Sequence, residues 1–294
     1  MCSLFAYLGE LAQVTGQLSL VQDFYRATLR ILCMIQHDYP EFLSGNHLHL
    51  SSSVPSNMVQ LLNIINCANP STFQELPDPF TPGLKINRLE QVRQKPHVSR
   101  DLDAILLKGG VKTALDQCLN GKDLSVEDVS DILHGLEASL TSRHRSALLP
   151  NAVILSIGAS ATIPSSAFTA AAPQAKGLES LINEASPEVR YQLISAMANQ
   201  IRYPNAHTHY FSTAFLHLFA AGSEDVQQTL ARVLVERLMV ARPHPWGLIV
   251  TILELIKNTN YNIFEQRWMK AAPEVERMLL NIAQTQGGYN SPGR

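Results

Sequence analysis

Histidine is the residue type in this chain with the clearest potential for metal binding or acid–base chemistry. The chain has ten histidines, and two pairs stand in an H-x-H pattern, His47 with His49 and His207 with His209. Residues two apart on a helix point to different faces, so His207 and His209 could share a metal only in a loop. A strand would place His47 and His49 on one side, but no cysteine or carboxylate partner stands beside them in the sequence. The pattern therefore favours structural histidines over a metal site at either pair.

Other sequence motifs for catalysis or cofactor binding are missing. Gly109–Thr113 places glycines before a lysine and a threonine, but it lacks the spacing of a phosphate-binding loop and a preceding strand. The paired carboxylates Glu127–Asp128 and Glu224–Asp225 stand where helix N-termini favour negative charge. We therefore predict that the chain is not an enzyme and needs no cofactor. A hydrolase that joins a histidine to a carboxylate from a distant part of the chain is the open alternative.

Composition and charge indicate a globular protein whose main ligand is not nucleic acid. Hydrophobic residues make up 46% of the 294 residues and charged residues 16%, and the formal net charge is -2. A nucleic-acid-binding surface would need a basic stripe. Arg232, Arg237 and Arg242 are spaced five residues apart, which spreads them around a helix. RNA binding by a helical repeat nevertheless stays as the alternative function.

The cysteines and the N-terminus bear on the cellular location. Cys33 and Cys67 lie among Leu, Ile and Met, so we expect buried free thiols and a reducing, cytoplasmic setting. No apolar run reaches the ~18–20 residues of a membrane span, and the N-terminus lacks the pattern of a signal peptide. Met1 opens almost directly into an amphipathic helix, which suggests a fragment of a longer protein.

Helical periodicity dominates the chain, and strand signals are scant. The apolar stripe after Pro187 recurs at helical spacing, and proline suits the first turn of a helix. Three prolines within residues 76–85 predict an extended loop, and residues 156–177 predict a short helix followed by a mobile loop. The other predicted helices lie near residues 3–15, 19–38, 57–67, 101–107, 111–119, 126–139, 144–156, 187–201, 211–221, 224–238, 246–256 and 273–282.

Two pairs of these helices repeat along the second half of the chain. One pair covers residues 187–221 and the next covers 224–257, an offset of roughly 37 residues that is close to the period of HEAT-like helical hairpins. The predicted fold is therefore all-α, an α-solenoid of stacked antiparallel helix pairs. We expect one domain over residues 1–286 and a flexible tail over residues 287–294.

Proline, histidine and aromatic residues gather at two boundaries between helices, Tyr203–Tyr210 and Arg242–Trp246. Large side chains in the loops of a helical scaffold could dock extended segments of partner proteins. The competing interpretation, which we favour slightly, is that they fold onto the helix ends and brace the hairpin corners. The candidate docking residues are Pro79, Phe80, Tyr203, His207, His209, Tyr210, Arg242, His244 and Trp246.

Several long strings of residues resemble one known family. They are HDYPEFL at 37–43, LPDPFTPGLK at 76–85, ANQIRYPNAHTHYFS at 198–212, RVLVERLMVARPHPWGL at 232–248, ELIKN at 254–258 and APEVERML at 272–279. These strings are similar to the C-terminal domain of the Not-one scaffold, the largest subunit of the Ccr–Not mRNA deadenylase complex. The resemblance runs from about Phe24 to Ala283 and thins at about residues 141–178.

This resemblance implies a HEAT-like domain without an active site that acts in mRNA deadenylation, decay and translational repression. In that family the domain docks the Not-two and Not-three/five subunits through extended segments, and in animal relatives it also binds short linear motifs of translational repressors. The resemblance further implies a cytoplasmic protein, in P-bodies and also in the nucleus. It implies no membrane partner and no direct contact with nucleic acid.

Overall fold

The computed structural model describes residues 1–13, 18–70, 75–99, 101–120, 125–141, 147–162 and 168–284, and every regular element in these ranges is helical. The all-α prediction is confirmed. In chain order the α-helices are α1 (Cys2–Gln13), α2 (Leu18–Asp38), α3 (Pro40–Gly45), α4 (His47–Ser53), α5 (Val59–Asn66), α6 (Leu102–Lys108), α7 (Lys112–Leu119), α8 (Val126–Thr141), α9 (Leu148–Ala161), α10 (Pro173–Glu184), α11 (Pro187–Ala198), α12 (Ala206–Ala221), α13 (Glu224–Met239), α14 (Trp246–Lys257), α15 (Arg267–Lys270) and α16 (Pro273–Gln284). Short 3₁₀ helices are η1 (Ile86–Arg88), η2 (Glu90–Arg93), η3 (Thr259–Tyr261) and η4 (Ile263–Glu265).

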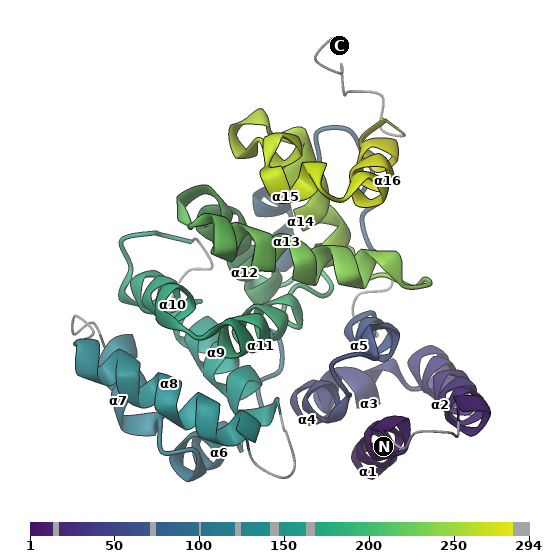
Figure 1. The fold of residues 1–294 in the computed structure, drawn as a ribbon, viewed down its shortest axis with the longest axis horizontal. Helices are drawn as coiled ribbons and strands as arrows, with labels where there is room; N and C mark the ends of the chain where they lie inside the picture. The colour runs from purple at the N-terminus through teal and green to yellow at the C-terminus, as the bar shows by residue number, and fades with distance from the viewer. Residues whose placement is uncertain are drawn as a thin grey trace.

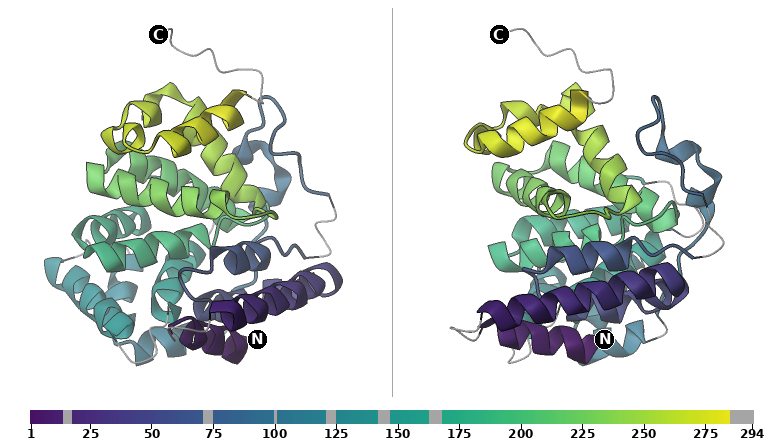
Figure 2. Two further views of the ribbon diagram at one scale, coloured as in Figure 1. Left: turned by 45° about the vertical axis from the view of Figure 1, so that its right-hand side comes forward. Right: turned by 90° about the vertical axis from the view of Figure 1, so that its right-hand side faces the viewer.

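The helices from α6 onward stack in successive tiers, as Figure 2 shows from the teal helices at one end to the yellow α16 at the other. In one layer α11 packs between α9 and α13. In the other layer α12 packs on α14, and α14 packs on α16. Each helix buries its apolar stripe against its neighbours, because a single helical pair cannot bury its apolar face alone. The prediction of an α-solenoid is therefore confirmed.

Two separate apolar cores hold the molecule together. The larger core runs through the solenoid from Leu48 to Ala283, and the smaller core lies within α1–α5, between Phe5 and Ala68. We call α1–α5 the N-terminal bundle, which Figure 1 shows in purple and dark blue beside the solenoid. The bundle joins the solenoid where α4 packs on α9 and α5 packs on α13.

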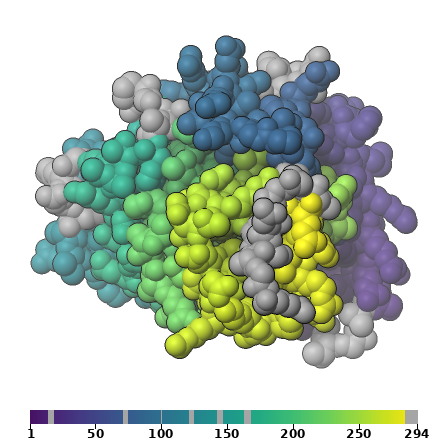
Figure 3. All heavy atoms as spheres, turned by 90° about the horizontal axis from the view of Figure 1, so that it is seen from above, coloured from purple at the N-terminus to yellow at the C-terminus, as the bar shows by residue number. Residues whose placement is uncertain are grey.

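The segment between the bundle and α6, residues 75–99, lies across the solenoid and is here called the strap. Figure 3 shows the blue strap beside the yellow-green helices of the C-terminal end. Two hydrogen bonds attach the strap to the solenoid. The indole Nε1 of Trp246 donates to the carbonyl of Pro77 (2.6 Å), and the backbone N–H of Ala206 donates to the carbonyl of Gln94 (2.8 Å). Residues 76–85 form a loop without a helix, as predicted, but the loop is not extended throughout, because turns close between Asp78 and Thr81 and between Thr81 and Leu84.

Three expectations about local structure differ from the structure. His47 and His49 lie on helix α4 rather than on a strand, because α4 packs its apolar side between α9 and α5. The stretch 156–177 begins in helix, as predicted, since α9 runs to Ala161, but α10 begins at Pro173, where the prediction had a loop. Residues 163–167 lie outside the described residues, as does the tail after Gln284.

Cys33 is exposed on α2, so the expectation of a buried thiol is wrong there. Position 33 faces away from the small core, to which the neighbouring Leu32 belongs. Burial raises the pKa of the Cys67 thiol, and it raises that of Cys118 to about 11, with a smaller contribution from Asp128. All four cysteines are free thiols.

Candidate protein-docking surfaces

The first predicted cluster, Tyr203–Tyr210, forms a buried corner between α11 and α12. Asn205 caps α12 by accepting a hydrogen bond from the backbone N–H of Thr208 (3.1 Å). The hydroxyl of Thr208 donates to the carbonyl of Tyr203 (2.7 Å) and so closes the turn. Tyr203, His207 and Tyr210 each expose 3% or less of their surface. The corner therefore braces the chain, and its aromatic side chains offer little surface to a partner.

The second predicted cluster, Arg242–Trp246, is half buried and half open. Trp246 exposes 5% of its surface and is tied to the strap through Pro77. Gly247 follows it and donates its N–H to the carbonyl of Arg202 (2.6 Å). A Cβ at this glycine would lie 2.8 Å from the backbone of Ile201, so only glycine permits the contact between the two corners. Arg242 is exposed, whereas His244 is half-buried with its Nε2 2.9 Å from the carbonyl of Val240.

The nine candidate docking residues thus fall into two groups. Tyr203, His207, Tyr210 and Trp246 are buried, whereas Pro79, Phe80, His209, Arg242 and His244 keep part or all of their surface. The bond between Trp246 and Pro77 brings the strap, with its 39% exposed Phe80, to the second corner. That any of these residues contacts a partner stays a prediction. Only the accessible ones, Pro79, Phe80, His209, Arg242 and His244, have surface with which to do so.

A cluster of buried polar side chains, which the sequence did not reveal, joins the N-terminal bundle to the solenoid. The amide of Asn63 donates to the carbonyl of Arg237 (2.7 Å), and that of Asn66 donates to Oδ1 of Asn199 (3.2 Å). Asn199 in turn donates to Oδ1 of Asn151 (2.9 Å). We call this cluster the polar seam; its members are His47, Asn63, Asn66, Asn151, Ser195, Asn199 and Arg237.

Arg237 occupies the middle of the polar seam without a carboxylate partner. Its Nη2 donates to Oδ1 of Asn199 (2.8 Å) and to the carbonyl (3.0 Å) and hydroxyl (3.1 Å) of Ser195. Burial lowers the pKa of Arg237 to about 10. Burial, and then the nearby guanidinium of Arg202, lowers the pKa of His207 to about 3 and that of His47 well below its usual value. Both imidazoles are therefore neutral at physiological pH and serve as structural groups.

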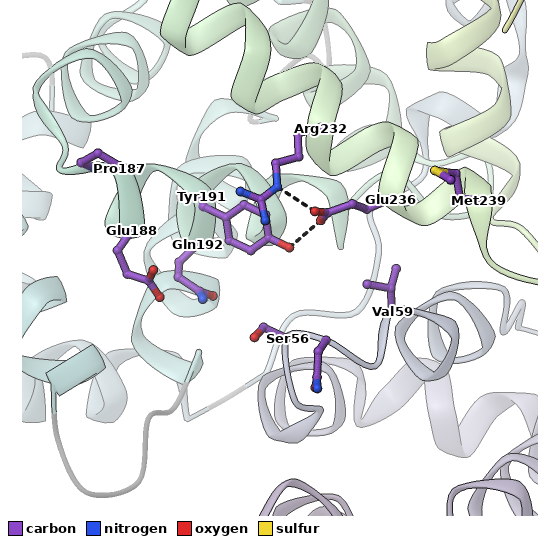
Figure 4. A pocket seen from close by; sticks show the side chains of 10 residues that line it. Ser56, Val59, Pro187, Glu188, Tyr191, Gln192, Arg232, Glu236 and Met239 are labelled. Carbon is purple, nitrogen blue, oxygen red and sulfur yellow. Dashed lines mark hydrogen bonds and ion pairs between the residues drawn. The ribbon is translucent and has the colours of Figure 1, made fainter. Parts of the chain in front are cut away.

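An open cleft lies on the other side of the junction between the bundle and the solenoid. It has a volume of about 590 Å³ and is lined by three segments far apart in the sequence. Figure 4 shows them: the loop before α5, the start of α11, and the second half of α13. The lining residues are Ser56, Asn57, Val59, Pro187, Glu188, Tyr191, Gln192, Arg232, Glu236 and Met239.

A three-residue network shapes the wall of the cleft. Glu236 accepts hydrogen bonds from the hydroxyl of Tyr191 (2.7 Å) and from Nε of Arg232 (2.7 Å). The guanidinium of Arg232 also lies over the Tyr191 ring, 5.0 Å from its centroid. Burial raises the pKa of Tyr191 to about 12, and the carboxylate of Glu236 adds to the effect. The phenol is therefore a neutral donor that holds Glu236 in place.

The five-residue spacing spreads Arg232, Arg237 and Arg242 around a helix, but it did not reveal the cleft. The sequence did hold one signal of this network: Arg232 and Glu236 stand at positions i and i+4, so their side chains meet on one face of a helix. The hydrogen bond from Tyr191 to Glu236 depends on the packing of α11 against α13, which a single sequence does not show.

The described residues hold no group of three or more His, Cys, Asp and Glu side chains placed to bind a metal ion. Ser130 and His134 lie 3.4 Å apart, but they share an exposed face of α8 rather than a pocket. In the ranges that the structure covers, no helix is long and apolar enough to cross a membrane.

Comparison with known proteins agrees with the resemblance seen in the sequence. The family model of the CCR4-Not complex component Not1 matches residues 1–283. The CCR4-NOT transcription complex subunit let-711 of Caenorhabditis elegans is 35% identical over 276 residues, which is 89% of this chain and 10% of that protein. The general negative regulator of transcription subunit 1 of Schizosaccharomyces pombe is 35% identical over 268 residues, 88% of this chain and 13% of that protein. The chain thus spans about a tenth of the curated relatives it matches.

Solved structures give the same result. The NOT1 superfamily homology domain from Chaetomium thermophilum superposes with a TM-score of 0.85 at 36% identity, over 96% of this chain and 57% of that one. A Not1 C-terminal domain solved in complex with Not4 superposes with a TM-score of 0.78 at 25% identity, over 94% of this chain and 57% of that one. The sequence match, the shared solenoid and the family model lead to one conclusion: the chain belongs to the Not1 family of CCR4-Not complex components.

Proposed function

We propose that this chain is a non-enzymatic docking domain of a CCR4-Not scaffold, and that it binds the Not2 and Not3/5 subunits. The observation that carries the proposal is the match of the Not1 family model over residues 1–283. A Not1 C-terminal domain of the same fold has been solved in complex with Not4, so this fold supports binding of another subunit in a relative. The chain then works in mRNA deadenylation, decay and translational repression, in the cytoplasm including P-bodies, and in the nucleus.

The physical basis of docking is the open surface of a solenoid whose helix ends are already braced. Because the aromatic side chains at the corners around Tyr203 and Trp246 are already buried against the rest of the chain, a partner gains little by displacing them. The accessible features are the cleft, the strap with Phe80, and the exposed Arg242. Extended partner segments gain affinity by placing a few large side chains into such gaps. Short linear motifs of translational repressors are a second class of ligand for the same surfaces.

Isothermal titration calorimetry with the N-terminal extended regions of Not2 and Not3/5 tests the proposal. We expect a saturable complex with each region, and co-elution in gel filtration. A chain that remains folded yet gives neither heat nor co-elution would contradict the proposal. Single-stranded RNA serves as the competing ligand in the same experiment. RNA affinity that falls steeply with salt would instead favour the RNA-binding alternative.

A further inference from the structure

The cleft between α11, α13 and the loop before α5 carries unused binding groups along its length. In the described part of the chain, the carboxylate of Glu188 takes part in no hydrogen bond or ion pair. The polar side chains of Ser56, Asn57 and Gln192 likewise have no side-chain partner there. These groups face one open volume of about 590 Å³, so a ligand could reach them together.

The charge of the cleft favours a cationic ligand. Glu188 and Glu236 bring two negative charges and Arg232 brings one positive charge, which leaves one net negative charge on the lining. Arg232 is already bonded to Glu236, and the negative charge of Glu188 adds to the rise in its pKa. The guanidinium is therefore occupied, whereas Glu188 is available to pair with a cation from outside.

The other end of the cleft is apolar. Figure 4 shows Pro187 and Glu188 on one side and Met239 on the other, with Ser56 facing Tyr191 between them. Met239 exposes 62% of its surface at the end of α13, and Val59 lines the cleft at the start of α5. A flexible thioether adapts to the shape of an apolar ligand side chain. Hydroxyl and amide side chains in the middle suit the N–H and C=O groups of an extended backbone.

We propose that the cleft binds an extended segment of a partner protein that places a Lys or Arg against Glu188 and an apolar side chain against Met239. The inference deepens the proposed function and rests on it, because it states which chemistry a docked subunit presents at this site. Ser56, Asn57 and Gln192 hold the intervening backbone.

This location gives the docked segment a second effect. The loop before α5 belongs to the N-terminal bundle, whereas α11 and α13 belong to the solenoid with the larger core. A segment in the cleft contacts both units and ties them together. Amide hydrogen exchange at residues 56–59 and 187–192 therefore slows when the segment binds.

The test uses the full chain and a phage-displayed library of short random peptides as the probe. Selected peptides are then synthesised and titrated against the wild-type chain, Glu188→Gln and Met239→Ala. We expect the selected peptides to share a basic and an apolar residue, and each variant to weaken binding about tenfold. Glu127→Gln is the matched control for the first variant, since Glu127 also lies exposed in the first turn of a helix. Met34→Ala is the control for the second, because Met34 exposes 64% of its surface on α2.

The outcomes separate this inference from the proposed function. Failure to select any peptide, selected peptides without a basic residue, or equal affinity for the cleft variants and the wild type would overturn the inference. Binding of Not2 and Not3/5 regions together with any of these results leaves the proposed function standing. The chain could instead bind selected peptides through the cleft and yet fail to bind Not2 and Not3/5. That result would overturn the identity of the partners, whereas the inferred chemistry of the cleft would stand.

Discussion

Two arginines on α13, five residues apart, are used in opposite ways. Arg237 is buried in the polar seam among neutral acceptors, and burial lowers its pKa to about 10. Arg232 lies in the cleft wall with 64% of its side chain exposed, and its bond to Glu236 raises its pKa. Five residues turn a helix by about 140° beyond one full turn, which places the two side chains on different faces.

The contrast between the two arginines divides the junction of bundle and solenoid into a buried face, which stabilises the fold, and an open face, which we propose as a binding site. On its buried face, a guanidinium held by Asn199 and Ser195 fixes α13 against α11, and the amides of Asn63 and Asn66 join these two helices to the bundle. Removing a partner from such a network leaves the other polar groups unsatisfied. On its open face, the charged pair keeps much of its hydration and leaves Glu188 free. If this division holds, substitutions in the polar seam should lower the stability of the fold, and substitutions in the cleft should change peptide binding.

Replacing Arg237 by Ala should produce the largest loss of stability. The variant leaves a cavity, removes one of the two donors to Oδ1 of Asn199, and takes the Arg237 donor away from the carbonyl and hydroxyl of Ser195, so we expect the free energy of unfolding to fall by about 3–5 kcal/mol. Chemical denaturation followed by circular dichroism measures the change. Arg232→Ala is the matched control on the same helix. Equal stability of the two variants would remove the proposed distinction between seam and cleft.

Trp246 extends the comparison to the second predicted cluster. If this side chain braces the strap, as its bond to Pro77 indicates, Trp246→Ala should lower the free energy of unfolding by about 3–5 kcal/mol. Phe80→Ala, in the exposed part of the same strap, should change it by no more than about 0.5 kcal/mol. Both are read from denaturation midpoints. A stable Trp246→Ala chain that no longer binds Not2 or Not3/5 would instead make Trp246 a docking anchor.

The neutral histidines beside the seam should make stability depend on pH. The folded pKa of His207, about 3, lies below that of an unfolded histidine, so the unfolded chain binds more protons as pH falls. For His207 the stabilisation is present above about pH 6.5 and is lost progressively toward pH 3, at about 2 kcal/mol between pH 7 and pH 5. His47, whose pKa is also lowered, acts in the same direction.

Denaturation at pH 7 and pH 5 of the wild type and of His207→Gln measures this dependence. The fall in stability between pH 7 and pH 5 should be smaller in the variant by about 2 kcal/mol, the part that His207 contributes. His134→Gln, which changes an exposed histidine on α8, should keep the full drop. A wild-type chain equally stable at both pH values would contradict the buried, neutral state of the two imidazoles.

Sequence alone predicted most helices of the solenoid, because their signals are local, but it missed α10, Pro173–Glu184. Pro187 starts α11, and the apolar spacing after it faces the larger core, as expected. Helix α4 was missed because His-Leu-His alternates like a strand over three residues, whereas the helix is specified by packing on α9. Asn63 and Asn66 look like ordinary helix-surface amides in the sequence; only the packing of α5 on α13 buries them. The cleft needs three distant segments to meet, and helical periodicity gives the face of each helix but not its neighbour.

Arg232→Ala should have only a small effect on stability and, unlike Glu188→Gln and Met239→Ala, should strengthen peptide binding. An exposed ion pair contributes about 0.2–1 kcal/mol, so the free energy of unfolding should fall by no more than that. The cleft loses its one cation and becomes more negative, which should strengthen binding of the selected basic peptides by about two- to fivefold, most at low salt. Glu236→Gln should weaken the binding of the same peptides, because it removes a negative charge from the same wall of the cleft. Titrations at two salt concentrations measure both effects. A loss of stability above about 2 kcal/mol, or weaker peptide binding by Arg232→Ala, would mean that this arginine supports the fold or contacts the ligand directly, and the contrast with Arg237 would then fail.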